Sequence, residues 1–293
     1  KDHQGNVTSH LSGLLYRTVN LIESGISPVF VFDGRYPEFK KKTIEEREKI
    51  REEARKKWEE AVRKGKPAIK YAQATSQMDE KILESSKKIL ELIGIPWVQS
   101  PSEGEAQCSY MCKKNHVFAT GSQDSDSLLF GSPRFVRNLS VSGRKKLPGK
   151  EVYIEVKPQM IELKNVLQEL GITREQLIMI GLLIGTDYNE GVEGVGPKTA
   201  LKLVKEHKPL ERLLTATEFP GEIDIERVYN FFLNPPYTEN YKLQPKEPDR
   251  DKLVKFMVDE HDFSQERMEK VVDKLQESYG KSKQSSLSGW GSK

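Results

Sequence analysis

The stretch SPVFVFDG, residues 27–34, decides the fold class of this sequence. Its apolar run has the length and the β-branched and aromatic content of a buried strand, and it ends in an acid followed by a glycine. A helical pattern precedes it over residues 9–25, and a long charged stretch follows it over residues 40–70. Helices that alternate with buried strands predict an α/β fold.

The composition describes a highly charged globular protein. The chain has 293 residues, of which 36% are apolar and 31% charged, and its formal net charge is +3. This length suits one large domain, or one domain with a smaller lobe. No run of about 18 apolar residues and no signal-peptide pattern occurs, so we expect an intracellular protein. Cys108 and Cys112 are expected to be buried thiols, because such a pair alone is weak as a metal site.

Acidic residues stand at the ends of four apolar elements of the sequence. They are Asp33, Glu103, Glu105, Asp124, Asp126 and Asp187. Ligands gather outside the carboxyl ends of the strands in open α/β sheets, so we expect these acids to converge. Carboxylates in one small volume cannot all stay ionised unless cations offset them, and oxygen ligands without His or Cys suit Mg²⁺ or Mn²⁺. Two such ions about 4 Å apart would suit phosphodiester hydrolysis.

The acids also have structural interpretations. In PSEGEAQC (residues 101–108), Ser102 can serve as a helix N-cap with Glu105 at the third helical position, which is the S-x-x-E capping box. The helix dipole favours both Glu103 and Glu105 there. The other acids can be turn residues, apart from Asp187, which is expected to close an apolar helix and to oppose its dipole. Their recurrence at four elements favours a functional site.

A basic stretch follows the first of these acids. From Lys40 to Lys70 there are 13 Lys or Arg residues against 7 Glu, in a chain whose total charge is only +3. The structural interpretation is a solvated helix with ion pairs four residues apart, such as Glu45 with Lys49. We favour substrate binding, because the positive excess is so local. Lys40 and Arg47 would project from one helix face toward the acids and hold a scissile phosphate.

The segment GVEGVGPKTA, residues 191–200, is the most specific single motif. Gly194, Gly196 and Pro197 permit a tight hairpin before a helix N-terminus, where backbone N–H groups and Lys198 suit phosphate. The pattern matches a helix-hairpin-helix, which grips the backbone of a duplex without reading its sequence. An ordinary glycine-rich turn is the alternative.

Two local predictions concern the residues between these motifs. RFVRNLSV (residues 134–141) and KEVYIEV (residues 150–156) have the pattern of two strands that form a hairpin around the basic loop SGRKKLPG, residues 142–149. Thr173 and Gln176 form a T-x-x-Q capping box, which predicts the start of the long apolar helix.

Several blocks together resemble the archaeal flap endonucleases of the structure-specific 5′-nuclease superfamily. They are VTSHLSGLLYRT, VFVFDG, PSEGEAQC, QDSDSLLFG and GLLIGTDYNEGVEGVGPKTA, in matching order and spacing over nearly the whole chain. The resemblance implies a PIN-like α/β nuclease core with a mixed, mainly parallel sheet, a helical arch and a helix-hairpin-helix C-terminal half. It implies a 5′-flap endonuclease and 5′-3′ exonuclease that cuts near the single-strand/duplex junction, in Okazaki fragment maturation and DNA repair.

The resemblance also implies roles for residues of this chain. Two Mg²⁺ ions, with Mn²⁺ as the alternative, would be ligated by Asp33, Glu103, Glu105, Asp124, Asp126 and Asp187. Lys40 and Arg47 match the basic arch residues that steer the scissile phosphate. Contacts with DNA are implied for Arg17, Glu103, Gly185, Asp187, Gly194, Gly196 and Lys198. Residues 189–199 match a hairpin that binds K⁺ and seats the downstream duplex.

The expected organisation follows from the same resemblance. Residues 1–160 form the N-terminal part of the nuclease core, with the arch at 38–80, and residues 161–280 form an internal nuclease region with the helix-hairpin-helix. Family members begin with a further strand that carries another metal-binding Asp, and this chain begins too close to Asp33 to include it. Loss of a central strand would expose apolar sheet edge, so we expect the sequence to be an incomplete record. If the strand is truly absent, the alternative is a non-catalytic duplex- or junction-binding module.

The tail over residues 281–293 is polar and rich in serine and glycine, which predicts disorder. Gln284, Leu287 and Trp290 fit the clamp-binding box of the family, in which Gly291 replaces a second aromatic residue. We therefore expect the tail to bind the replicative sliding clamp with weakened affinity. The expected partners are this clamp and branched DNA with a 5′ flap. We expect a monomer with no membrane partner, in the cytoplasm of an archaeon and associated with DNA.

Overall fold

The computed structural model describes residues 2–64, 80–140, 143–146 and 152–288. The chain forms two compact units, each built from separated segments. Unit 1 comprises Lys1–Phe30, Gln77–Val98 and Asn240–Lys293, and unit 2 comprises Val31–Ser76 and Gln99–Glu239. This division differs from the sequential one expected at residue 160, because the last helices of the chain pack with the first ones.

Unit 1 is helical. Its elements are α1 (Ser9–Glu23), α4 (Glu80–Leu92), α12 (Arg250–Val254), η2 (Lys255–Asp259, a π-helical turn) and α13 (Gln265–Ser288). Helix α1 packs against α4 and α13, and α12 packs against the same two helices. Leu15 of α1, Ile89 of α4 and Val272 of α13 are fully buried, so each helix turns an apolar stripe inward. The helix predicted over residues 9–25 is confirmed.

Helix α13 extends into the segment that was expected to be a disordered tail. It runs to Ser288, beyond the predicted start of disorder at Lys281. Val271, Val272 and Leu275 are buried and hold the earlier turns in place, so each further residue adds a helical hydrogen bond without a new nucleation step. An ion pair of 2.7 Å joins Lys281 to the residue four positions before it.

Two of the predicted strands pair with each other. Strand β1 (Phe30–Phe32) lies within SPVFVFDG, and β2 (Trp97–Gln99) lies within the next short apolar run. The boundary between the units falls inside each strand. Strand β1 therefore delivers the chain directly to Asp33 at the start of unit 2.

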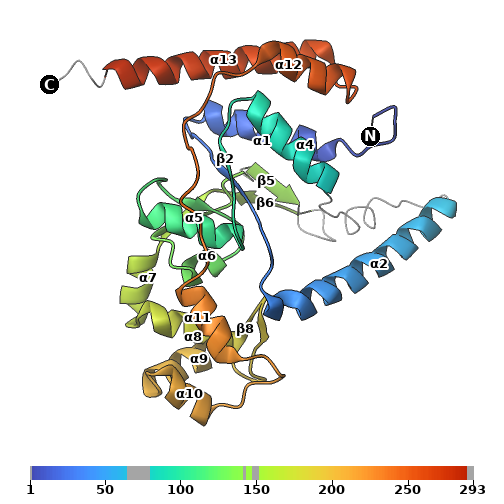
Figure 1. Ribbon diagram of the computed structural model, residues 1–293. Helices are drawn as coiled ribbons and strands as arrows, with labels where there is room; N and C mark the ends of the chain where they lie inside the picture. Colours follow the sequence, from blue (N-terminus) through green and yellow to red (C-terminus); the bar gives the residue numbers. More distant parts are fainter. Residues whose placement is uncertain (1, 65–79, 141–142, 147–151, 289–293) are drawn as a thin grey trace. The chain divides into compact units, whose positions relative to one another are not determined.

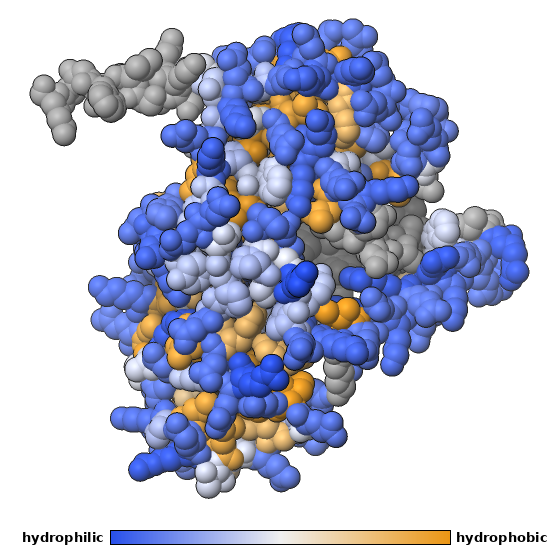
Figure 2. Space-filling view, in the orientation of Figure 1, coloured by the Kyte–Doolittle hydropathy of each residue, from blue (hydrophilic) through white to orange (hydrophobic). Residues whose placement is uncertain are grey.

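A long basic helix follows this first strand in unit 2. It consists of η1 (Glu38–Lys40) and α2 (Lys41–Arg63), and Figure 2 shows α2, at the right, covered almost entirely by hydrophilic side chains. Ion pairs four residues apart line it, and Glu45 pairs with Lys41 at 3.9 Å rather than with the expected Lys49. The arch was expected over residues 38–80, of which residues 65–79 lie outside the described part.

The remaining elements of unit 2 are helices and short strands, several of which are labelled in Figure 1. The helices are α5 (Gly104–Lys113), α6 (Asp126–Leu129), α7 (Leu163–Leu170), α8 (Arg174–Ile184), α9 (Pro197–Glu206), α10 (Leu210–Ala216) and α11 (Ile225–Leu233). The strands are β3 (Thr120–Gly121), β4 (Arg134–Arg137), β5 (Gly143–Lys146), β6 (Tyr153–Val156), β7 (Gln159–Glu162), β8 (Gly185–Thr186) and β9 (Asn189–Glu190).

The three-stranded sheet of unit 2 is mixed. Strand β4 pairs with β3 in parallel, with Thr120 opposite Phe135, and with β7 in antiparallel, with Phe135 opposite Ile161. Phe135 is fully buried at the centre of this sheet. The mixed α/β architecture expected from the sequence is confirmed.

The predicted hairpin around residues 142–149 is wrong in its pairing. Strand β6 pairs with β5, which belongs to the expected basic loop, and Gly143 lies opposite Val156. The expected partner strand β4 pairs with β3 and β7 instead. Tyr153 and Ile154 of β6 are 57% and 41% exposed, so the hairpin is held by its backbone ladder more than by a buried face. The distribution of apolar residues in the sequence therefore does not predict the pairing of β5 with β6.

The core of unit 2 lies where α5, α6, α8 and α11 meet. Phe130, Ile178, Leu182, Val228 and Phe232 are at most 1% exposed and pack in one cluster. The ring centroids of Phe130 and Phe232 lie 4.9 Å apart. This cluster anchors the elements that carry the acidic residues.

Helix α8 begins as predicted. The Thr173 side chain accepts a hydrogen bond from the Gln176 backbone N–H, and the Gln176 side chain accepts one from Thr173, so the capping box is confirmed.

Two glycine substitutions in unit 1 should change stability in opposite directions. Gly94 has φ +73°, and a Cβ there would lie 2.0 Å from the carbonyl oxygen of Lys246. Gly94→Ala should lower the free energy of unfolding by about 2–4 kcal/mol, because a backbone atom cannot move aside. Gly280, inside α13, has no atom within 4 Å of an added Cβ, so Gly280→Ala should raise stability by about 0.5 kcal/mol. Denaturant unfolding measures both, and equal effects would contradict this account.

Candidate active site

Asp33 lies directly after β1, and its carboxylate reaches the start of α5. Its Oδ1 accepts a hydrogen bond of 2.7 Å from the backbone N–H of Gly104. A Cβ on Gly104 would lie 2.9 Å from the same oxygen. The acid that follows the strand therefore requires the glycine that opens the helix.

The expected capping box of Ser102 and Glu105 is wrong. Glu103 is the N-cap residue of α5, with φ −71° and ψ 130°, and no side chain caps the helix from that position. Asp33 accepts the hydrogen bond of the first helical N–H instead, so a local cap is not needed there. The Glu105 carboxylate accepts a hydrogen bond from the Ser122 hydroxyl. The side chains of both glutamates therefore bind groups outside the helix and do not cap its end.

Lys40 places a buried ammonium among the acids. Its Nζ lies 2.9 Å from both carboxylate oxygens of Glu103, and each of the two residues is only 7% exposed. The same Nζ lies 3.7 Å from Oδ2 of Asp187. The rings of Tyr36 and Tyr188 approach it, with centroids 5.5 and 5.3 Å away. Carboxylates and ring faces together make this a strong position for a cation.

Asp187 lies in the turn between β8 and β9, and not at the end of a helix as expected. Helix α8 ends at Ile184, and Gly185 then takes φ +106°. A Cβ on Gly185 would lie 2.8 Å from the backbone nitrogen of Gly191. The glycine thus permits the close chain crossing that turns Asp187 toward the acids, and Asp187 does not oppose a helix dipole.

Helix α2 binds Asp187 through two side chains. Arg47 Nη2 lies 2.7 Å from Oδ1 of Asp187, and the Thr43 hydroxyl donates a hydrogen bond of 2.7 Å to the Asp187 carbonyl. Lys40 approaches the other carboxylate oxygen. The structure therefore brings Lys40 and Arg47, seven residues apart, together with the acids.

Asp124 and Asp126 follow β3 at the start of α6. The Asp126 backbone N–H donates a hydrogen bond of 3.2 Å to Oδ1 of Asp124, and the Asp124 N–H donates one of 3.0 Å to the Ser122 Oγ. Ser122 also binds Glu105. One serine therefore links Asp124 to Glu105.

Burial and mutual repulsion perturb the acids. Burial, together with the nearby carboxylates of Asp124 and Asp126, raises the pKa of Glu105 to about 8. Burial also raises the pKa of Asp126 to about 7, with Asp124 as the strongest like charge. For Glu103, burial raises the pKa and Lys40 opposes the rise. The carboxyls act as one electrostatic cluster, in which each added negative charge favours a cation.

The chemistry of these side chains fits divalent cations. All six are oxygen donors without His or thiolate, the set that Mg²⁺ and Mn²⁺ prefer. In the part of the chain that the structure describes, however, no three His, Cys, Asp or Glu side chains are already arranged around a single metal position. Lys40 and Ser122 instead bind the two glutamates. The carboxylate oxygens lie near one another, and they must move closer together to coordinate an ion.

The other predicted residues are distributed as follows. Arg17 is exposed on α1 of unit 1, whereas the acids belong to unit 2. Gly194 has φ +77°, Gly196 is the N-cap of α9, and Lys198 is exposed in the first turn of that helix. Helices α8 and α9 pack against each other on either side of this hairpin.

Among the predicted clamp-binding residues, Gln284 and Leu287 fall within α13. Trp290 lies outside the described residues.

Sequence reasoning missed the residues that surround the predicted ones. Tyr188 is 2% exposed and faces Lys40, and its hydroxyl is among the groups that lower the pKa of Glu103. Thr43 donates to the backbone carbonyl of Asp187, and Ser122 donates to the Glu105 carboxylate. Only Tyr188 had a signal in the sequence, since it follows Asp187 at once. The hydroxyls carry no pattern that sets them apart from surface serine and threonine.

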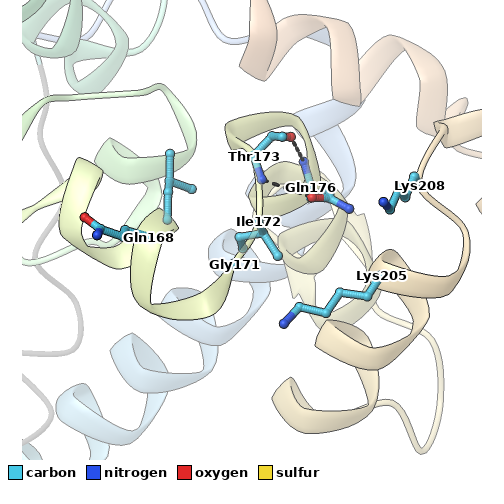
Figure 3. A pocket seen from close by; sticks show the side chains of 8 residues that line it. Gln168, Gly171, Ile172, Thr173, Gln176, Lys205 and Lys208 are labelled. Carbon is cyan, nitrogen blue, oxygen red and sulfur yellow. Dashed lines mark hydrogen bonds between the residues drawn. The ribbon is translucent and has the colours of Figure 1, made fainter.

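A hollow in unit 2 lies elsewhere. It has a volume of about 580 Å³ and lies between the start of α8 and the end of α9, as Figure 3 shows. Gln168, Thr173, Lys205 and Lys208 are among its lining residues, and none of the six acids lines it. The chemistry of the cluster therefore does not depend on this hollow.

Comparison with known proteins decides the family. Residues 1–54 match the XPG N-terminal domain, and residues 94–187 match the XPG I-region, which ends at Asp187. Flap endonuclease 1 of Archaeoglobus fulgidus is 55% identical over 292 residues, covering 99% of this chain and 86% of that protein. The chain belongs to the flap endonuclease family. Flap endonuclease 1 of Staphylothermus marinus is 52% identical over 298 residues, with 99% and 85% covered.

A solved flap endonuclease shows the same fold. Flap endonuclease-1 from Methanococcus jannaschii superimposes with a TM-score of 0.73 at 38% identity, covering 96% of this chain and 85% of that one. As a flap endonuclease, the chain is a structure-specific 5′-flap nuclease that hydrolyses phosphodiester bonds of branched DNA in replication and repair. The predicted family, fold class and enzyme class are confirmed, and the non-catalytic alternative is not favoured. None of the described helices combines the length and apolar content that a membrane span needs.

Raised pKa values in the cluster predict how stability depends on pH in EDTA. Between about pH 4.5 and 8 the folded state keeps a proton on Glu105 that the unfolded chain has released. Unfolding therefore releases a proton, and rising pH should destabilise the protein across this range. Glu105→Gln should flatten the slope, as measured by urea unfolding at each pH. Lys281 lowers the pKa of Glu277, so Glu277→Gln should leave the slope above pH 5 unchanged. A slope equal in wild type and Glu105→Gln would contradict the prediction.

Proposed function

We propose that this flap endonuclease cleaves with two Mg²⁺ ions, Mn²⁺ being the alternative, held by the six carboxylates of the acid cluster. The observation that carries the proposal is the position of Lys40, whose buried ammonium lies 2.9 Å from Glu103 and 3.7 Å from Asp187. A site that already binds one cation between its carboxylates has the charge and the donors to bind others.

In this proposal the carboxylates form two sets. Glu103 and Glu105 of α5 would hold one ion, and Asp124 and Asp126 would bridge toward the other alongside Asp187, with Asp33 completing the ligands. When bound, such a pair of ions activates water and stabilises the charge that develops on the phosphate. The protein orients Asp33 through Gly104, Glu105 through Ser122 and Asp187 through the turn at Gly185.

Lys40 and Arg47 would bind the scissile phosphate. Arg47 keeps half of its side chain exposed, which suits capture of a phosphate from solvent, and its fork of N–H donors matches phosphate oxygens. Lys40 lies deeper and supplies a point charge next to the acids. The pair therefore offers the phosphate an outer and an inner contact on one face of the arch.

The hairpin between α8 and α9 would grip duplex DNA. Gly194 and Gly196 leave the backbone open to a phosphate, Lys198 adds charge, and residues 189–199 would bind K⁺. Gly185 permits close approach of DNA beside Asp187, and Arg17 would contact the substrate backbone from α1. Such contacts recognise the shape of a junction and not its sequence, as a flap nuclease and 5′-3′ exonuclease requires.

In the cell we propose a monomer that acts in the cytoplasm of an archaeon, on Okazaki fragments and repair intermediates. Its tail would bind the sliding clamp through Gln284, Leu287 and Trp290.

Removal of one cluster acid should abolish cleavage and not folding. Asp126→Ala, or Asp124→Ala, should lower the rate of cutting of a labelled double-flap DNA by about 10²–10⁴-fold in Mg²⁺, because a ligand of the reacting ion is lost. EDTA should remove the activity of the wild type completely. Gel analysis of products near the junction measures both.

A matched control is another aspartate of unit 2. Asp224 caps α11 by accepting a hydrogen bond from the Arg227 N–H. Asp224→Ala should cost about 1 kcal/mol of stability and leave the cleavage rate within twofold. If Asp126→Ala and Asp224→Ala had the same rate, the acid cluster would not be the active site.

Loss of the tail should weaken the clamp contact alone. Deletion of residues 284–293 should reduce affinity for the archaeal sliding clamp at least tenfold in calorimetry, since the predicted box is then absent. Cleavage of double-flap DNA without the clamp should not change. Equal clamp affinity before and after the deletion would rule out this partner site.

A further inference from the structure

Helix α6 is a single turn that carries Asp126 at its first position and ends at Leu129. One turn cannot persist through its own backbone hydrogen bonds, because nucleation costs more than so few bonds return. The neighbours of α6 therefore decide where the Asp126 carboxylate lies.

Two cations bind the carbonyl end of this helix. Arg174, the first residue of α8, donates to the Leu129 carbonyl from Nε at 3.1 Å and from Nη2 at 3.0 Å. Lys113, the last residue of α5, donates from Nζ to the Phe130 carbonyl at 2.8 Å. Both carbonyls lie at the C-terminal end of α6, where the helix dipole favours positive charge.

The same guanidinium also binds the end of a second helix. Arg174 Nη2 lies 2.5 Å from the Phe232 carbonyl, and Nη1 lies 3.4 Å from that of Leu233, both at the end of α11. One side chain therefore joins the C-terminal ends of α6 and α11, and α11 is anchored in the core through Phe232. The position of α6 is thereby fixed relative to the apolar core of unit 2.

Gly131 leaves the space that this arrangement needs. It has φ +81°, and an added Cβ would lie 2.5 Å from Arg174 Nε and 2.9 Å from Lys113 Nζ. The two cations approach the backbone so closely that only hydrogen fits there. Gly131 ends the block QDSDSLLFG, so its presence after the two aspartates has a physical reason.

The arrangement has an electrostatic cost. Desolvation of the ammonium, together with the nearby charge of Arg174, lowers the pKa of Lys113 to about 8. Within the described ranges, no carboxylate forms an ion pair with either cation. Apolar side chains could fill this space without that cost. The two cations instead provide directional hydrogen bonds, and each bond fixes the position of one carbonyl at the end of α6.

We propose that Arg174 is a positioning residue for Asp126, with Lys113 as its second support. By holding the carbonyl end of α6, the two side chains fix the carboxylate at the opposite end toward the acid cluster. The inference rests on the proposed role of Asp126 as a metal ligand. Groups that orient a ligand from outside typically change metal affinity by about 10–100-fold when they are removed.

The test is metal binding without DNA. Arg174→Met keeps the length and loses every donor, so it should weaken Mn²⁺ binding about tenfold, measured from the electron paramagnetic resonance signal of free Mn²⁺. Arg174→Lys should recover part of the affinity, because an ammonium can still reach a carbonyl. In cleavage assays the half-saturating Mg²⁺ concentration should rise, while the rate at saturating Mg²⁺ stays near that of the wild type.

Gln176 offers a matched control on the same helix. Its Nε2 donates a hydrogen bond of 2.8 Å to the Val204 carbonyl in α9, which carries none of the acids, and Figure 3 shows it beside Thr173. Gln176→Met should lower the melting temperature and leave Mn²⁺ affinity unchanged. If Arg174→Met behaved in the same way as this control, Arg174 would be merely structural and the inference would fail.

Further variants separate the possible failures. Lys113→Met should weaken Mn²⁺ binding severalfold, and it replaces Arg174→Met as the test if that protein does not fold. Asp126→Asn is the reference for the proposed function itself, which fails if this variant binds Mn²⁺ and cleaves like the wild type. If Asp126→Asn loses affinity while Arg174→Met and Lys113→Met do not, only the positioning role is overturned.

Discussion

Repulsion between carboxylates is the constraint on which unit 2 depends. Burial raises the pKa of Glu105 to about 8 and that of Asp126 to about 7, so the cluster resists its own ionisation. The fold opposes this by giving three of the acids a donor: a backbone N–H for Asp33, an ammonium for Glu103 and a guanidinium for Asp187. Burial of the apolar core formed by α5, α6, α8 and α11 offsets the destabilisation that this repulsion causes.

Helix α8 connects the separate parts of this arrangement. Its first residue, Arg174, holds the carbonyl ends of α6 and α11, and Gln176 in its first turn holds α9. Its far end leads through Gly185 into the turn that presents Asp187. Between these ends Ile178 and Leu182 are fully buried. One apolar helix thus sets the relative positions of two of the acids and of the hairpin that we propose binds duplex DNA.

The sequence predicted the local features well. The strand before Asp33, the capping box of Thr173 and the helix of α1 follow from periodicity and short-range hydrogen bonding, so a window of residues is enough. The cap of α5 could not be predicted, because its acceptor is Asp33, far earlier in the chain. The pairing of β5 with β6, the turn at Asp187 and the support of α6 by Arg174 likewise depend on partners that no local pattern names. The acids stand out in the sequence because several carboxylates placed after apolar elements would repel one another. Their hydroxyl partners do not stand out, because serine and threonine are common on any protein surface.

The discontinuous construction of unit 1 has a consequence for biosynthesis. Helices α1 and α4 turn apolar stripes toward α12 and α13, yet all of residues 99–239 are translated before those two helices. At ordinary translation rates this delay is on the order of ten seconds. Unit 2, which contains every acid of the cluster, can therefore fold before α12 and α13 are made. During that time the apolar faces of α1 and α4 that pack against those helices remain exposed. The nascent chain thus has its longest exposure to aggregation and to chaperones in unit 1, at a stage when the acids of unit 2 can already be in place.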